Sequence, residues 1–70
     1  MTIPELHRII NQRREAKGVV PVSLQAIHYV IKKKLIIGKH YEQTGAKSPI
    51  FLLPSGINFL EIYYNATVEN

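Results

Sequence analysis

The most constraining feature of this sequence is the helical spacing of apolar residues in the stretch "SLQAIHYVIKKKL". Leu24, Ile27, Val30 or Ile31, and Leu35 recur at steps of three and four, which is the period of a helix with one buried face. Ser23 stands before them and is a favourable N-cap residue. The stretch therefore predicts an amphipathic helix that runs to about Lys34. The face opposite the apolar one then carries Gln25, His28, Tyr29, Lys32 and Lys33.

An earlier helix is predicted over "TIPELHRIINQRREAKG". Thr2 and Glu5 have the spacing of a capping box, and a proline in the first turn costs no hydrogen bond. Gly18 marks the expected C-terminal stop. The apolar stripe of this helix consists of Ile3, Leu6, Ile9 and Ile10.

A hairpin and a third helix are predicted after Gly38. The segments "HYEQ" and "PIFLL" have the composition of short strands, and "TGAKS" between them is rich in turn residues. "PSGINFLEIYYN" then predicts a helix that Ser55 caps. Its expected packing face consists of Ile57, Leu60 and Tyr64, flanked by Phe59 and Tyr63.

The order helix, turn, helix, hairpin, helix indicates an α+β protein with a single domain over residues 1–70, of which 65–70 are expected to fray. A hairpin that follows the second helix and carries a basic tip is the arrangement of a winged helix-turn-helix. In that arrangement the second helix enters the major groove of DNA and the hairpin reaches the neighbouring backbone or minor groove.

Charge favours a polyanionic partner. The formal net charge is +4, and all nine Lys and Arg residues lie within residues 1–47. Small soluble domains also carry excess lysines for solubility alone, so charge by itself leaves both explanations open.

Several classes of protein are not expected. The absence of cysteine excludes disulfides and thiolate chemistry and suits a cytoplasmic protein. No apolar run approaches the roughly 18 residues that span a bilayer, and Glu5, His7 and Arg8 interrupt any signal-peptide core. The histidines are too scattered for a metal site, no cofactor is implied, and no nucleophile, base and orienting group have suitable spacing. We therefore expect no enzyme.

The stretch "VSLQAIHYVIKKKLIIGKHYEQTGAKSPIFL" resembles the core of small excisionase-type proteins of phages and integrative elements, in the MerR-like winged-helix group. The resemblance covers roughly residues 2–64 as a pattern of residue types. It implies a non-enzymatic factor that binds repeated DNA sites cooperatively, bends DNA and biases a tyrosine integrase towards excision. The segment "QRREAKGVVPV" is longer than the tight turn usual in that group. Either the first helix runs on by a turn, or the two helices pack at an unusual angle.

The candidate DNA-binding residues fall into three sets. The recognition helix supplies Ser23, Gln25, His28, Tyr29, Lys32 and Lys33. The wing supplies Lys39, Thr44, Lys47 and Ser48. Possible contacts to the DNA backbone come from Arg13, Arg14 and Lys17. Each set has a structural alternative, because lysines often form a solvated helix end and cations near a helix C-terminus complement its dipole. His40 and Tyr41 are expected to pack at the base of the wing.

Three functions follow from these patterns. The first is double-stranded DNA binding as an excisionase-like recombination directionality factor, with a tyrosine integrase as partner and self-association on DNA. The second is transcriptional regulation by a phage-type protein of the same fold. The third is a protein-interaction adaptor that does not bind DNA and uses the "IFLL" strand with Tyr63 and Tyr64.

Overall fold

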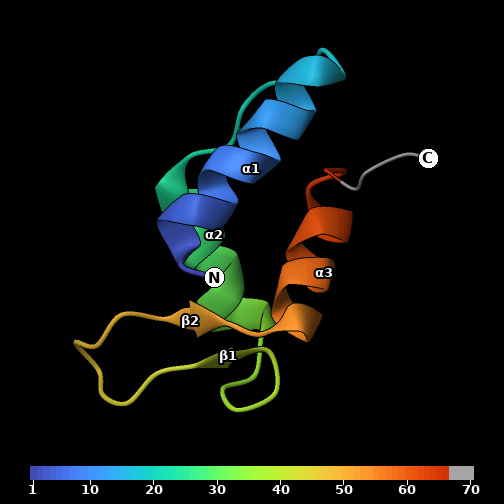
Figure 1. Ribbon diagram of the computed structural model, residues 1–70. Coiled ribbons are helices and arrows are strands. Elements are labelled where there is room, and N and C mark those ends of the chain that lie inside the picture. The colour runs from blue at the N-terminus through green and yellow to red at the C-terminus, as the bar shows by residue number, and fades with distance from the viewer. Residues whose placement is uncertain (67–70) are drawn as a thin grey trace.

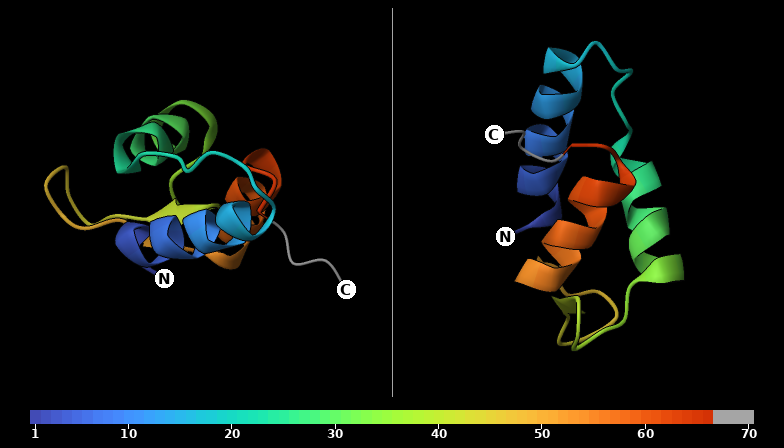
Figure 2. Two further views of the ribbon diagram at one scale, coloured as in Figure 1. Left: turned by 90° about the horizontal axis from the view of Figure 1, so that it is seen from above. Right: turned by 90° about the vertical axis from the view of Figure 1, so that its right-hand side faces the viewer.

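The computed structural model describes residues 1–66, which contain three helices and one hairpin (Figure 1). Helix α1 (Ile3–Ala16) leads away from the hairpin, α2 (Leu24–Lys34) returns towards it, and α3 (Pro54–Tyr63) starts beside it and leads away again. Figure 2 shows α1 and α2 side by side, with α3 packed against both. The predicted α+β class and the predicted order of elements are confirmed.

The hairpin consists of two short antiparallel strands, β1 (Tyr41–Glu42) and β2 (Phe51–Leu52). Tyr41 pairs with Leu52, and Glu42 pairs with Phe51. The strands are shorter than the segments "HYEQ" and "PIFLL" that predict them. Between them a long loop, residues 43–50, projects to one side of the helices (Figure 1).

The N-terminal residues extend this hairpin by a further pairing. Thr2 forms an antiparallel bridge with Phe51, and the Leu52 amide donates to the Met1 carbonyl at 2.8 Å. Strand β2 therefore lies between β1 and the start of the chain. The pairing fixes the beginning of α1 against the hairpin, and nothing in the sequence pattern indicated it.

Both predicted ends of α1 are confirmed. The Thr2 hydroxyl accepts from the Glu5 amide, and the Glu5 carboxylate accepts from the Thr2 amide, so the capping box is complete. The Thr2 hydroxyl also donates to this carboxylate at 2.8 Å. This side-chain hydrogen bond, followed by the one from the Thr2 backbone, lowers the pKa of Glu5 below its ordinary value of 4.5. At the other end Gly18 adopts a φ of 71°, a left-handed conformation that favours glycine.

The connection between α1 and α2 is held by the side chain of Asn11. Its carbonyl oxygen accepts from the Val22 amide at 2.9 Å, and its Nδ2 donates to the Val22 carbonyl at 3.0 Å. His7 Nε2 lies 2.9 Å from the same carbonyl. Helix α1 continues to Ala16, so the first five residues of the segment "QRREAKGVVPV" are helical.

The hydrophobic core lies where the three helices meet the hairpin. The buried apolar residues are Ile3, Leu6, Ile10, Ile27, Val30, Ile31, Leu35, Leu52, Leu60, Tyr64 and Ala66. Burial raises the pKa of Tyr64 above its ordinary value of 10.0. Within residues 1–66, no helix combines the length and the apolar character needed to cross a bilayer.

Two details of the predicted packing are wrong. Leu24, expected on the inward face, is 37% exposed; it is the first residue of α2, at the end of the buried stripe. Ser55 does not cap α3, whose N-cap is Leu53 without a side-chain cap bond. Pro54 instead takes the first helical position, and the Ser55 hydroxyl donates to the Lys39 carbonyl at 2.6 Å.

Of residues 65–70, which were expected to fray, the structure describes only Asn65 and Ala66. The Ala66 amide donates to the Glu61 carbonyl at 2.7 Å, and the Ala66 side chain is buried. Asn65 is exposed and has a φ of 52°. Residues 67–70 lie outside the described part of the chain.

Candidate nucleic-acid interface

The exposed face of α2 carries the side chains that the sequence placed there. Gln25, Tyr29, Lys32 and Lys33 are exposed and His28 is half-buried, while Ile27 and Ile31 on the opposite face are fully buried. Burial of the apolar face against α1 and α3 therefore turns the polar face towards solvent. This face presents two ammonium groups, an imidazole, a phenol and an amide within three turns of helix.

Ser23 caps the N-terminal end of α2. Its hydroxyl accepts from the Ala26 amide at 3.1 Å, which confirms it as the N-cap of α2. Such a cap satisfies a backbone donor that would otherwise lack a partner. Its hydroxyl remains at the exposed helix end, so the prediction of a DNA contact there stays a prediction.

The three consecutive lysines at the end of α2 have different surroundings. Lys33 Nζ lies 5.8 Å from the centre of the Tyr29 ring, and Lys34 Nζ lies 5.9 Å from that of Tyr63. Both distances are within the range of cation–π attraction. Lys32 makes no ion pair or ring contact with any residue in the described part of the chain. Within residues 1–66 its charge is therefore not neutralised.

A cleft of about 450 Å³ separates α2 from the hairpin loop. The helix contributes His28 and Lys32. The loop contributes Gln43, Ala46, Lys47, Ser48, Pro49 and Ile50. The fold thus brings together, on one concave surface, two of the recognition-helix residues and two of the wing residues that the sequence singled out.

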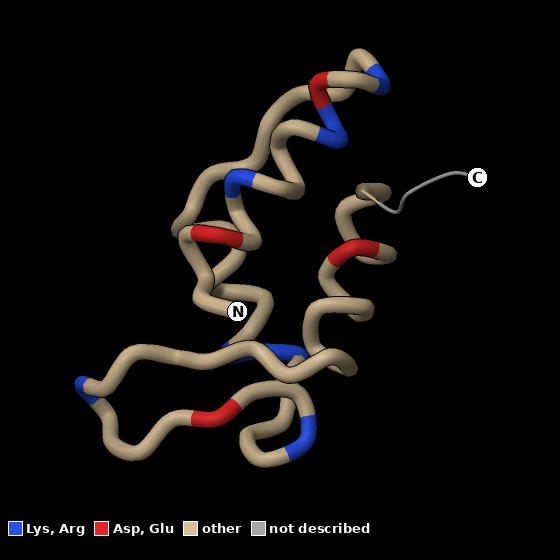
Figure 3. Tube along the Cα trace, viewed as in Figure 1, with Lys and Arg blue, Asp and Glu red and all other residues tan. Residues whose placement is uncertain are grey.

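Lys47 is the only cation in the loop between β1 and β2. Figure 3 shows a positive charge on this loop, which projects to one side of the helices. Lys47 is exposed and forms no ion pair with residues 1–66. Together with Lys32, it gives the cleft a positive charge on each side that no carboxylate within residues 1–66 neutralises.

The other two wing candidates lie outside the cleft lining. Lys39 belongs to the turn between α2 and β1, where its side chain is exposed and its carbonyl accepts from Ser55. The Thr44 hydroxyl donates to the Ser48 hydroxyl at 3.0 Å within the loop. Their predicted contacts with DNA stay predictions.

The cations at the end of α1 bind the C-terminal end of α3. The Arg13 guanidinium forms an ion pair with Glu61 and donates to the Ala66 carbonyl at 3.1 Å. Arg14 donates to the carbonyls of Tyr64, at 2.5 Å, and Val20, at 2.7 Å. Lys17 Nζ donates to the Asn65 carbonyl at 3.2 Å. The acceptors are the Val20 carbonyl in the α1–α2 connection and carbonyls that directly follow α3, and the ion pair places opposite charges together. All three cations therefore have a structural role.

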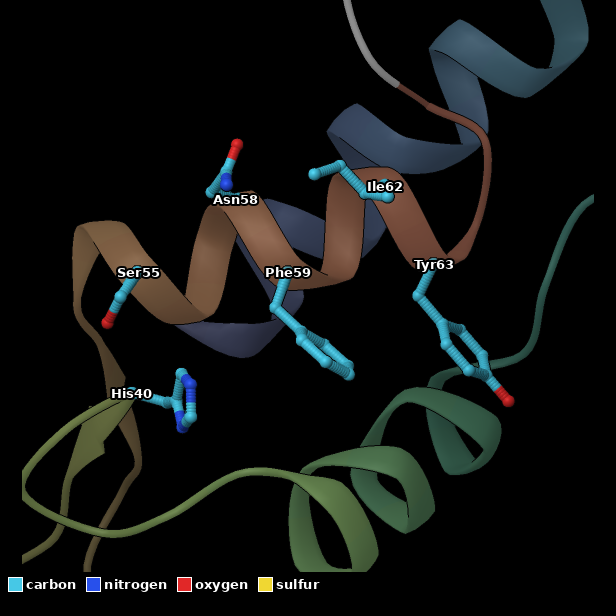
Figure 4. Close-up of a pocket in the computed structure, with 6 residues that line it drawn as sticks. All are labelled: His40, Ser55, Asn58, Phe59, Ile62 and Tyr63. Atoms are coloured by element: carbon cyan, nitrogen blue, oxygen red, sulfur yellow. The ribbon is translucent and has the colours of Figure 1, made fainter.

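A second cavity, of about 290 Å³, lies between α3 and the segment that follows α2. Its lining consists of His40, Ser55, Asn58, Phe59, Ile62 and Tyr63 (Figure 4). Two of its polar groups have partners within the fold, since His40 Nδ1 accepts from the Ile36 amide at 2.9 Å and Ser55 donates to Lys39. The His40 and Phe59 ring centres are 6.1 Å apart, so His40 packs at the base of the hairpin as predicted.

No group of three metal-ligating side chains comes together among residues 1–66. Two residues that do matter for the interface region escaped the sequence reasoning. Gln43 lines the cleft, and Asn11 secures the connection that precedes α2. Neither residue type is distinctive in a sequence, and only the fold shows which backbone groups they reach.

Comparison of the chain with models of known protein families, with curated proteins and with solved structures finds no match.

Proposed function

We propose that this protein binds double-stranded DNA as a winged helix-turn-helix, with α2 in the major groove and the β1–β2 loop on the adjacent sugar-phosphate backbone. The observation that carries the proposal is the cleft between α2 and the loop. There, Lys32 and Lys47 face one concave surface from two elements. A charged strand that enters this cleft would meet a cation on each wall.

The size and chemistry of α2 suit a groove. The major groove of B-DNA is roughly 12 Å wide and admits a helix. Lys32 and Lys33 would neutralise phosphates and release counterions. Gln25 is suited to adenine, whose N6 and N7 match a side-chain amide, and His28 and Tyr29 can reach base edges or phosphates. The Lys33–Tyr29 contact would hold both side chains on the same face.

The proposed biological role is that of an excisionase-like recombination directionality factor. It rests on the resemblance of residues 2–64 to that group. In this role the protein would bend DNA and assemble on repeated sites, so that a tyrosine integrase favours excision. An excision assay with the integrase of the same element, with and without the protein, tests this role separately from DNA binding.

The apolar surface available for the alternative adaptor function is smaller than the sequence predicts. Leu52 and Tyr64 are 1% and 8% exposed and belong to the core. Phe51 and Tyr63 remain exposed, at 52% and 49%. Of the six side chains in this surface, Ile50 and Leu53 are half-buried, so only Phe51 and Tyr63 are exposed to a partner.

Fluorescence anisotropy with a labelled mixed-sequence duplex tests DNA binding. We compare the wild type with Lys32→Gln/Lys33→Gln at about 50 mM and about 200 mM salt. The matched control is Arg8→Glu, which lowers the net charge by the same amount at an exposed site on α1 outside both cavities. Circular dichroism confirms that each variant is folded.

The proposal predicts affinity that falls steeply with salt, by a factor of about three to four per phosphate contact over this range. Loss of two lysine contacts should reduce the slope of log affinity against log salt by about 2. Arg8→Glu should leave that slope nearly unchanged. Unaltered affinity and slope after removal of both lysines would refute the proposed interface.

A further inference from the structure

The loop between β1 and β2 is closed on itself by one side-chain amide. Gln43 Nε2 donates to the Ser48 carbonyl at 2.8 Å and to the Ala46 carbonyl at 3.4 Å. Gln43 is half-buried and follows directly after β1. Its side chain therefore ties the start of the loop to the far side of the tip.

Without this amide the tip has few other restraints. The Ser48 amide donates to the Gly45 carbonyl at 3.0 Å, and the hydroxyls of Thr44 and Ser48 are in contact. Both bonds lie within the exposed turn. Among residues 1–66, Gln43 alone joins the strand end to the backbone of the tip through its side chain. The two acceptor carbonyls flank Lys47.

We propose that Gln43 is a positioning residue that holds Lys47 over the cleft, opposite His28 and Lys32. The inference rests on the proposed function. Gln43 itself lines that cleft. Its hydrogen bonds therefore restrain the loop at the point where the loop faces α2. A loop ordered before binding does not lose its conformational freedom when DNA arrives, which strengthens binding without any new contact.

A double-mutant cycle in duplex binding tests this role. The variants are Gln43→Met, which keeps the shape and removes both donors, Lys47→Ala, and the combination. Gln43→Glu serves as a second variant, because a carboxylate cannot donate to the two carbonyls. The matched control is Gln12→Met, the same substitution at an exposed position of α1.

We expect Gln43→Met to weaken binding about 2- to 10-fold, the range that corresponds to one net hydrogen bond. In the Lys47→Ala background the same substitution should have no further effect, since no cation remains to be positioned. Gln12→Met should bind as the wild type does. Backbone order parameters of the free protein should fall at Ala46 and Lys47 in Gln43→Met.

Two outcomes would overturn the inference and leave the proposed function intact. One is full affinity in Gln43→Met and Gln43→Glu while Lys47→Ala weakens binding. The other is an equal loss from Gln43→Met with and without Lys47, which would show that Gln43 acts independently of it. If neither Lys47→Ala nor the Lys32/Lys33 variant changes affinity, DNA binding at this cleft fails and the role of Gln43 fails with it.

Discussion

Gly56 lies where the first turn of α3 meets the base of the hairpin, and a methyl group there has no room. A Cβ added to Gly56 would lie 2.1 Å from the His40 carbonyl oxygen and 3.0 Å from its carbon. The obstacle is backbone, so it cannot rotate away as a side chain can. The same oxygen accepts from the Leu53 amide at 2.9 Å, which links the turn before β1 to the start of α3.

The cost of Gly56→Ala can be estimated from these contacts. Relief of the overlap requires a shift of backbone in a packed region, which typically costs about 1–3 kcal/mol. Weakening of the Leu53–His40 hydrogen bond adds about 1 kcal/mol. The higher helix propensity of alanine relative to glycine stabilises the variant by about 1 kcal/mol. We therefore expect a net loss of about 1–3 kcal/mol in the free energy of unfolding, or a fall of about 4–24 °C in Tm for a domain of this size.

Thermal and urea denaturation followed by circular dichroism measure this loss. The matched control is Gly45→Ala, where the added Cβ would meet the Ser48 hydroxyl oxygen at 3.4 Å, an ordinary contact. We expect that variant to stay within about 0.5 kcal/mol of the wild type. A Gly56→Ala protein as stable as the wild type would show that α3 does not approach the His40 carbonyl so closely.

Three further perturbations test the fold. Ile27→Asp places an unpaired charge at a fully buried position and should cost more than about 4 kcal/mol; a cooperative melt near the wild-type Tm would show that the inward face of α2 is misassigned. Asn11→Ala leaves the Val22 amide without its acceptor and the Val22 carbonyl with His7 alone, and should lower the free energy of unfolding by about 1–3 kcal/mol in urea denaturation. A variant as stable as the wild type would show that Asn11 does not hold that connection. The pKa of Glu5 is lower in the folded than in the unfolded protein. Its contribution to the free energy of unfolding is therefore fully present at pH values above the unfolded-state pKa, and it is lost as the pH falls through the folded-state pKa. The stability of Glu5→Gln should therefore fall less than that of the wild type as the pH is lowered. The same dependence of stability on pH in the two proteins would contradict the capping-box assignment.

Much of the fold could be predicted because its signals are local. Ile27, Ile31 and Leu35 follow the period of a helix with one buried face, and they are buried. The capping box of Thr2 and Glu5 depends only on residues three apart. Short-range geometry fixes such features regardless of what the rest of the chain does.

The features that were missed depend on distant parts of the chain. The bridge from Thr2 to Phe51 joins residues that no sequence pattern relates. Arg13 has the position of a cation that complements its own helix, yet it forms an ion pair with Glu61 on α3. Leu24 has the correct spacing for burial, yet it remains 37% exposed at the start of α2. In each case the tertiary arrangement decides the partner.

One part of the candidate interface could be predicted from the sequence, and another part could not. The exposed face of α2 follows from the position of its apolar face, so residues such as Gln25 and Lys32 could be named in advance. The cleft could not, because it depends on how the loop folds back towards α2, and Gln43 gains its importance only there.

An NMR titration of isotope-labelled protein with duplex DNA tests the proposed interface most directly, because every backbone amide reports separately. Binding as proposed predicts shift changes on the exposed face of α2 and in residues 43–50, with little change at the Arg13–Glu61 end of the helices. Changes centred on that end, or on the cavity beside Phe59 and Tyr63, with the α2 amides unmoved, would contradict it.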